Sequence, residues 1–252
     1  MNTITVRLEH DFLEKFPDAS IHVLVADKVT SVNENVVTEW QQRAAAAVVS
    51  WQIDPQRLLE EPWIADWRNA MKKMGVNAAK TRSSIEQLAK RALSGTFIKT
   101  PILVVNLYCA VSTIAKAPMG GYRLESLKGD VRVRLAQRSE QFLGIGEKSP
   151  FSVPPGVVVY SDDDKVACYA WNHKDSAETC ITPQTERAVF FADGVTIEGR
   201  GRAYEGIQLL ATALASSGSQ VLSIGTLDRR VAVLTIPVPR ERLDWDEVIH
   251  SG

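Results

Sequence analysis

The chain has few cysteines, and their arrangement suggests no structural role. There are three in 252 residues, Cys109, Cys168 and Cys180, and no two of them have C-x-x-C spacing. An odd number without that spacing argues against a framework of disulfides and against a structural zinc site, and it suits a reducing compartment. We therefore expect a cytoplasmic protein with free thiols.

Long hydrophobic runs are also missing. The longest, PILVVNLYCAV from Pro101, is far too short to span a bilayer. The N-terminal MNTITVRLEHDFLEKF carries charge throughout and has no apolar stretch typical of a signal peptide. Hydrophobic residues make up 45% and charged residues 23%, the balance of an ordinary soluble globular protein. We expect no membrane partner.

No charge sign dominates, and no cofactor motif is complete. The 29 Lys and Arg face 30 Asp and Glu, so a net charge of -1 excludes a bulk polycation that coats nucleic acid, and we expect no DNA partner. The glycine-rich run at Gly144 lacks the spacing of a phosphate loop. None of the four histidines is paired with another at helical metal-ligand spacing. These absences predict a protein without metal or cofactor.

Hydrophobic periodicity predicts alternating helices and strands. Apolar residues recur at three- and four-residue steps from about 34 to 51, and Ser83 with Glu86 fits a capping box. Helices are expected at 34–51, 63–74, 84–93, 101–115 and 202–217, and strands at 4–8, 21–25, 130–135, 157–160, 166–171, 188–191 and 231–236. FPDAS and the acidic run 162–164 should be turns, the second a solvated hairpin turn. With no linker, the pattern predicts one mixed α/β domain over 1–252, its mixed sheets flanked by helices.

Positive charge is concentrated in two stretches. Residues 67–93 hold seven Lys and Arg against Glu86 alone, and residues 116–138 hold six against two acids. Such a concentration predicts a face that binds anions, of which phosphate backbones are the commonest. A solvated helix surface would give the same counts, so both interpretations are open.

Three segments carry more polar chemistry than a scaffold needs. Asn106 and Tyr108 lie in an apolar stretch, where a buried amide and phenol need partners that a ligand would supply. Gly120 and Gly121 leave the backbone open to close approach by a bound group. The run from Trp171 to Ser176 places polar groups directly after an apolar strand.

In their order along the chain, these segments resemble a known family. The resemblance rests on Trp67, MGV from Met74, KTRSSIEQL from Lys80, NLY from Asn106, GGY from Gly120, GDVRVR from Gly129 and WNHKDS from Trp171. Together they are similar to the B3/B4 editing domain of the phenylalanyl-tRNA synthetase β-subunit, in its archaeal-like form. The similarity covers about residues 4–191, and the C-terminal helix and strand should complete the domain. The synthetase's catalytic core and anticodon-binding extension have no counterpart here, so we expect a free-standing relative.

The resemblance implies hydrolysis of the ester between a wrong amino acid and the 3′ end of a tRNA. In the synthetase, this domain removes tyrosine from the phenylalanine tRNA. Free-standing relatives are trans-editing deacylases, and one group clears canavanine from the arginine tRNA. Canavanine is nearly isosteric with arginine, which is where a second hydrolytic sieve is useful. The implied partner is a mischarged aminoacyl-tRNA, with canavanyl-tRNA(Arg) as the candidate substrate.

The resemblance also implies roles for individual residues, with a positioned water in place of a covalent nucleophile. Gly120 and Gly121 would offer backbone N–H groups to the ester, and Asn106 and Tyr108 would orient the water or the α-amino group. The residues expected to hold the terminal nucleotide or the amino acid are Lys80, Arg82, Ser83, Trp171, Asn172, Asp175 and Asp130. Asp130 competes with an alternative role as an ion-pair partner of Arg132 or Arg134. The residues expected to follow the acceptor stem are Arg68, Lys72, Lys73, Lys90 and Arg91.

The water-activating base and the activity itself are open at this stage. The resemblance identifies no base, and His173 is one candidate. Two other functions fit the sequence: a non-catalytic tRNA-binding or protein-interaction module of the same fold, and an amino-acid-ester hydrolase that does not act on tRNA. Binding that does not weaken with salt would favour the latter, because phosphate contacts make affinity fall as salt rises.

Overall fold

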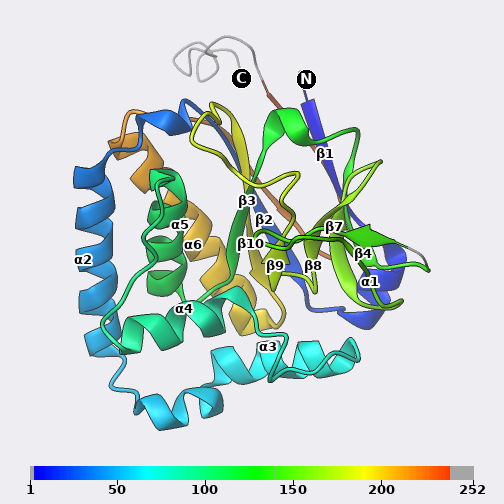
Figure 1. Ribbon diagram of the computed structural model, residues 1–252, viewed down its shortest axis with the longest axis horizontal. Coiled ribbons are helices and arrows are strands. Elements are labelled where there is room, and N and C mark those ends of the chain that lie inside the picture. The colour runs from blue at the N-terminus through cyan, green and yellow to red at the C-terminus, as the bar shows by residue number, and fades with distance from the viewer. Residues whose placement is uncertain (1–2, 139, 239–252) are drawn as a thin grey trace.

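The computed structural model describes residues 3–138 and 140–238, and within them two larger β-sheets and six α-helices (Figure 1). The helices are α1 (His10–Lys15), α2 (Glu34–Ser50), α3 (Pro62–Lys73), α4 (Ser84–Leu93), α5 (Leu103–Ala115) and α6 (Ile197–Ser216). Short 3-10 helices are η1 (Val29–Ser31), η2 (Pro55–Glu60) and η3 (Leu124–Ser126). The fold is therefore of the mixed α and β class that the sequence predicts.

The larger sheet has six strands in the order β12-β1-β4-β7-β8-β9. These are β12 (Val233–Pro237), β1 (Thr3–Leu8), β4 (Val131–Leu135), β7 (Val158–Ser161), β8 (Val166–Tyr169) and β9 (Lys174–Asp175). Strands β1 and β4 are parallel, and all other neighbours in this sheet are antiparallel. We call it the six-stranded sheet.

The smaller sheet has four strands in the order β11-β2-β10-β3, and all its neighbours are antiparallel. These are β11 (Gln220–Leu227), β2 (Ser20–Asp27), β10 (Ala188–Gly194) and β3 (Met119–Arg123). We call it the four-stranded sheet. A separate hairpin pairs β5 (Gln141–Phe142) with β6 (Phe151–Ser152).

The four-stranded sheet lies between the six-stranded sheet and a layer of helices (Figure 1). Successive side chains of a strand point to opposite faces. In β10, Val189 and Phe191 accordingly join the core shared with the six-stranded sheet, whereas Phe190 and Ala192 join the core under α2, α5 and α6. A strand that is buried on both faces has a continuous run of apolar residues, and in β10 this run continues from Ala188 to Ala192.

Most predicted elements are confirmed, and the differences have local causes. Helix α1 occupies part of the segment between the first two strands, where only a turn was expected. Strand β8 ends at Tyr169 rather than at 171, because Ala170 and Trp171 have φ angles of 52° and 66°, which no strand accommodates. The run at 162–164 is not simply solvated: Asp162 is 5% exposed and accepts backbone N–H groups from Lys128, Asp164 and Lys165.

The capping box at the start of α4 is half confirmed. The Ser83 hydroxyl accepts the N–H of Glu86 at 3.3 Å, as predicted. The Glu86 carboxylate does not return to Ser83. It is fully buried, and its oxygens lie 3.1 Å from Arg68 Nη1 and 2.7 Å from Lys90 Nζ. This ion-pair group joins α3 to α4 at one end of the sheets.

Candidate functional site

A cavity of about 70 Å³ opens between the two sheets, beside the N-terminus of α4. Its wall combines Gly120 and Tyr122 of β3, Asp193 of β10, Asp175 of β9 and the turn after β8. The cavity therefore joins strands from both sheets, and the residues of these strands that line it are up to 74 positions apart in the chain. It is lined by two carboxylates that lack a cationic partner among the described residues.

Asp193 lies at the buried end of this cavity. It is 4% exposed, and because it alternates with Val189 and Phe191 it faces the six-stranded sheet. Tyr160 donates its hydroxyl to one carboxylate oxygen at 2.5 Å, and Asn172 Nδ2 donates to the other at 3.2 Å. Burial raises the pKa of Asp193 to about 7, and the donors of Tyr160, Asn172 and Trp171 only partly oppose the rise.

Asp175 is the more accessible carboxylate. It is partly exposed, and Tyr122 donates its hydroxyl to Oδ1 over a long 3.3 Å. Burial raises the pKa of Asp175 to about 6, against weaker opposing effects of the Cys168 thiol and the Tyr122 hydroxyl. Two acids with raised pKa values in one hollow make it a candidate functional site.

The turn after β8 contributes polar groups of Trp171, Asn172 and His173 to the cavity wall. Trp171 is fully buried and packs its ring edge-on against Phe12, Phe16 and Trp67, which holds the left-handed backbone in place. Its indole Nε1 is buried without a hydrogen bond of normal geometry, although it lies near enough to Asp193 to lower the pKa of that carboxyl. Asn172 Oδ1 and Ser84 Oγ are also buried without a hydrogen-bond partner. Buried polar atoms normally have partners, so three unpaired atoms around one cavity indicate a site for a polar ligand or water.

His173 completes the lining. Its Nδ1 lies 2.7 Å from the backbone oxygen of Arg82, and since a carbonyl only accepts, Nδ1 carries the proton. The other ring nitrogen, Nε2, is then the one with a free lone pair. Burial lowers the pKa of His173, so the ring is neutral at neutral pH.

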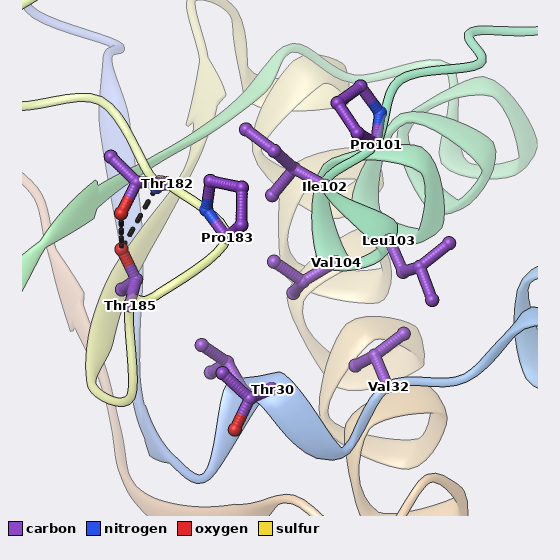
Figure 2. A pocket seen from close by; sticks show the side chains of 10 residues that line it. Thr30, Val32, Pro101, Ile102, Leu103, Val104, Thr182, Pro183 and Thr185 are labelled. Atoms are coloured by element: carbon purple, nitrogen blue, oxygen red, sulfur yellow. Dashed lines mark hydrogen bonds between the residues drawn. The ribbon is translucent and has the colours of Figure 1, made fainter.

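A second, larger hollow of about 140 Å³ lies at the start of α5 and is not a better candidate. Figure 2 shows Pro183 and Thr185 across from the first turn of α5. Apart from three threonines, its lining side chains are aliphatic or proline, and none is an acid, base or thiol. The threonine hydroxyls have partners, including each other, so this hollow supplies neither a proton acceptor nor an unpaired polar group.

The sequence profile of the B3/4 domain family matches residues 66–209, more than half of the chain. The chain belongs to the B3/4 domain family. Every residue that lines the cavity between the sheets falls inside the matched range. No curated protein matches the chain at a significant level.

One solved structure similar to this B3/4 domain is the N-terminal fragment of the phenylalanyl-tRNA synthetase β-subunit from Pyrococcus horikoshii. The two have a TM-score of 0.46 and 11% sequence identity. The match covers 86% of this chain and 50% of the fragment, so the chain corresponds to about half of the fragment's length.

The B3/4 domain brings four of the predicted site residues to the cavity: Gly120, Trp171, Asn172 and Asp175. Gly120 faces Asp175 directly, since a Cβ placed on it would lie 3.8 Å from both carboxylate oxygens. A glycine here leaves the space above the carboxylate open.

The two glycines do not offer free N–H groups to the cavity as predicted. Asp193 N donates to the Pro118 oxygen at 3.1 Å, and hydrogen-bonded pairs alternate along antiparallel strands. Gly120, opposite Phe191, is therefore hydrogen-bonded within the sheet. Gly121 directs its peptide groups to the other edge of β3, where Tyr122 forms a β-bridge with Cys180. A Cβ on Gly121 would point into the helical core.

These two glycines give a matched stability test. A Cβ on Gly121 would lie 2.7 Å from Phe190 Cδ1 and 3.0 Å from Ile181 Cδ1, so Gly121→Ala should lower the free energy of unfolding by about 1–3 kcal/mol. Gly120→Ala makes only ordinary contacts and should change it by less than about 1 kcal/mol. Urea denaturation of both variants measures the difference. Equal losses would contradict the assignment of the two faces.

Asn106 and Tyr108 lie away from the cavity, on α5. Asn106 Oδ1 accepts the N–H and hydroxyl of Thr100, and its Nδ2 donates to the Thr100 oxygen at 2.9 Å. Its amide is thus paired within six residues, and no ligand is needed to explain it. Tyr108 packs against Phe190 in the helical core, where burial raises the pKa of its hydroxyl. The roles predicted for both residues are not supported by this geometry.

Four other predicted site residues have structural or surface positions. Ser83 is the helix cap described above, and Lys80 is exposed in the turn before it. Arg82 is exposed and contributes to the site through its backbone oxygen, which holds His173. Asp130, directly before β4, lies 2.5 Å from Arg7 of β1 and 3.9 Å from Arg132, so it belongs to an ion-pair group, as the alternative interpretation had it.

The predicted tRNA-binding residues divide into two groups. Arg68 and Lys90 are paired with Glu86, so their charge is partly neutralised within the protein. Lys72, Lys73 and Arg91 are exposed. In the second basic stretch, cations form ion pairs within the protein: Arg132 pairs with Asp163, and Arg134 pairs with Glu140.

Sequence reasoning missed Asp193, Tyr160, Tyr122 and Ser84 as parts of the site. Asp193 carried a signal: it ends the run AVFFADG, and a carboxylate in a strand buried on both faces needs an explanation. The other three have ordinary sequence contexts, and only the fold brings them to the cavity.

Within residues 3–138 and 140–238, no group of three or more histidine, cysteine or acidic side chains is placed to hold a metal ion. In the same part of the chain, no helix combines the length and the hydrophobicity needed to cross a membrane.

Proposed function

We propose that this B3/4 domain hydrolyses the ester bond of a mischarged aminoacyl-tRNA. The observation that carries the proposal is the cavity with two carboxylates, a neutral imidazole and three unpaired buried polar atoms. Membership of the B3/4 domain family, together with the resemblance of the sequence motifs to a synthetase editing domain, supports tRNA as the partner. The exposed Lys72, Lys73 and Arg91 provide positive charge for the phosphate backbone.

The chemistry follows from the polar groups around the cavity. His173 Nε2 takes a proton from a water molecule, whose oxygen attacks the ester carbonyl carbon. The unpaired Trp171 N–H and Ser84 hydroxyl donate to the oxyanion that forms. When the tetrahedral intermediate collapses, the bond to the ribose oxygen breaks and His173 returns the proton to that oxygen. The products are a free amino acid and a tRNA with an intact 3′ end.

The carboxylates suit binding of the amino acid better than proton abstraction. Asp193 is deep and already accepts hydrogen bonds from Tyr160 and Asn172. Asp175 lies beside the side-chain-free Gly120 and has acceptor capacity left. Within this proposal, the amino acid enters over Gly120 and the terminal nucleotide stays on the surface near α4.

A panel of mischarged tRNAs tests this function, including canavanyl-tRNA(Arg) and tyrosyl-tRNA(Phe). We expect purified protein to release amino acid from at least one of them faster than buffer does, while correctly charged tRNAs persist. Release no faster than in buffer across the panel would reject the deacylase. If tRNA then still bound with an affinity that falls as salt rises, the chain would be a non-catalytic binding module. Hydrolysis of small amino-acid esters alone, independent of salt, would indicate an esterase that does not use tRNA.

A further inference from the structure

The cavity between the sheets has an excess of hydrogen-bond acceptors. Asp175 and Asp193 together offer four carboxylate oxygens, and each oxygen has two lone pairs. Tyr122 and Tyr160 donate one hydroxyl each, and Asn172 donates its amide to Asp193. Several acceptor positions therefore stay unused, most of them on Asp175, whose other neighbouring donor is the weak thiol of Cys168.

Positive charge does not reach these acceptors from the protein itself. Lys174 is the cation that lines the cavity, and its Nζ lies 2.5 Å from Glu147. His173 also lines it but is neutral, because burial lowers its pKa. Apart from Lys174, whose ammonium is paired with Glu147, the described wall has negative or neutral side chains, so a cationic ligand would complement it.

An unpaired acceptor stands beside the carboxylates. Asn172 is 9% exposed, its Nδ2 is fixed on Asp193, and its Oδ1 is buried with no donor. Fixing Nδ2 also fixes the direction of Oδ1, so the amide cannot turn to pair it without losing Asp193. A buried carbonyl oxygen held without a donor costs about 1–3 kcal/mol unless a ligand or water supplies one.

We propose that the cavity binds a primary ammonium group, the α-amino group of the aminoacyl ester, on Asp175 and Asn172 Oδ1. The inference rests on the proposed function and names the part of the substrate that this site selects. An ammonium has three N–H donors and a positive charge, which match one carboxylate, one amide oxygen and a third acceptor in the same hollow. The cavity volume of about 70 Å³ is large enough for an ammonium group. Because Gly120 has no side chain, the ammonium can reach the Asp175 carboxylate.

Two stable analogues isolate the ammonium. In one, L-alanine is joined to 3′-amino-3′-deoxyadenosine through an amide, which replaces the ester. In the other, L-lactate is joined in the same way, so that a hydroxyl replaces the ammonium. We expect calorimetry at neutral pH to show at least tenfold tighter binding of the alanyl compound. In Asp175→Asn the preference should fall to about twofold or less, whereas Asp18→Asn, at an exposed carboxylate, should retain it.

A second pair of probes omits the nucleoside. L-Alaninamide should shift the indole N–H resonance of Trp171 in a titration, and L-lactamide at the same concentration should not. If tRNA hydrolysis fails but alaninamide binds, the proposed function is wrong and the ammonium site stands. If hydrolysis is observed but the two analogues bind equally well, the ammonium site is wrong and the function stands. Displacement of alaninamide by Mg²⁺ at equal concentration would instead assign the cavity to a metal ion and overturn the inference.

Discussion

His173→Gln is expected to lower the rate constant for deacylation by about 10²-fold or more and to leave KM nearly unchanged. Glutamine preserves much of the volume of histidine but has no nitrogen that takes a proton at neutral pH, and a positioned base contributes about 10²–10⁴-fold. Single-turnover hydrolysis of the substrate found in the panel measures the effect. His10→Gln, at an exposed histidine on α1, is the matched control and should react at the unaltered rate.

The pH dependence of the rate constant and that of KM distinguish the role of His173 as the base from the role of Asp175 in binding. Because burial lowers the pKa of His173, the ring stays neutral below the ordinary 6.5, and the rate constant should fall only at more acidic pH. Burial raises the pKa of Asp175 to about 6, so the carboxylate becomes protonated as pH drops through that value and KM should rise there. A rate constant in His173→Gln that kept the wild-type value and pH profile would remove His173 from the mechanism and leave the water without an identified base.

Glu86→Ala is expected to lower the free energy of unfolding by about 3 kcal/mol. The Glu86 carboxylate is fully buried, contacts Arg68 and Lys90 and lies 3.8 Å from Arg82 Nε. Its removal leaves Arg68, whose side chain is 20% exposed, without a counter-charge. Breaking a buried pair in this way costs about 3–5 kcal/mol, and the partial exposure of both cations places this case at the lower end. Urea denaturation followed by tryptophan fluorescence measures the loss.

Glu205→Ala is the control for this variant, because Glu205 is exposed on α6. It should change the free energy of unfolding by less than about 0.5 kcal/mol. A loss below about 1 kcal/mol in Glu86→Ala would show that both cations reach water without the carboxylate. In that case Arg68 and Lys90 would again be available to bind a phosphate backbone.

The helices were predictable because their apolar faces follow the 3.6-residue period, and α2, α3 and α4 lie where that period places them. Strand β3 was not, since Met119–Arg123 contains two glycines and becomes a strand only by pairing with β10. Strand β11 was missed for a similar reason, with Gly225 in its middle. The assignment of residues 1–252 to one domain stays a prediction, and residues 239–252 lie outside the described part of the chain.

The site was half predictable. The polar run after β8 was identified because Trp171, Asn172 and Asp175 directly follow an apolar strand. Asn106 was assigned to the site because a buried amide in an apolar helix needs a hydrogen-bond partner. That partner is Thr100, six residues earlier, and not a ligand. Asp193 and Tyr160 are 33 positions apart and meet only because β7 and β10 belong to facing sheets.

Because side chains of β10 alternate between two cores, this strand should not tolerate the insertion of a single residue. Inserting one codon between those for Ala188 and Ala192 would exchange the two faces of the strand. The residues after the insertion would turn to the opposite face, which would place the carboxylate of Asp193 among the aliphatic side chains under α6. Insertions at the exposed residues 148–150 would not reverse the faces of any strand. We therefore expect differences in chain length between homologous proteins to occur there and not in β10.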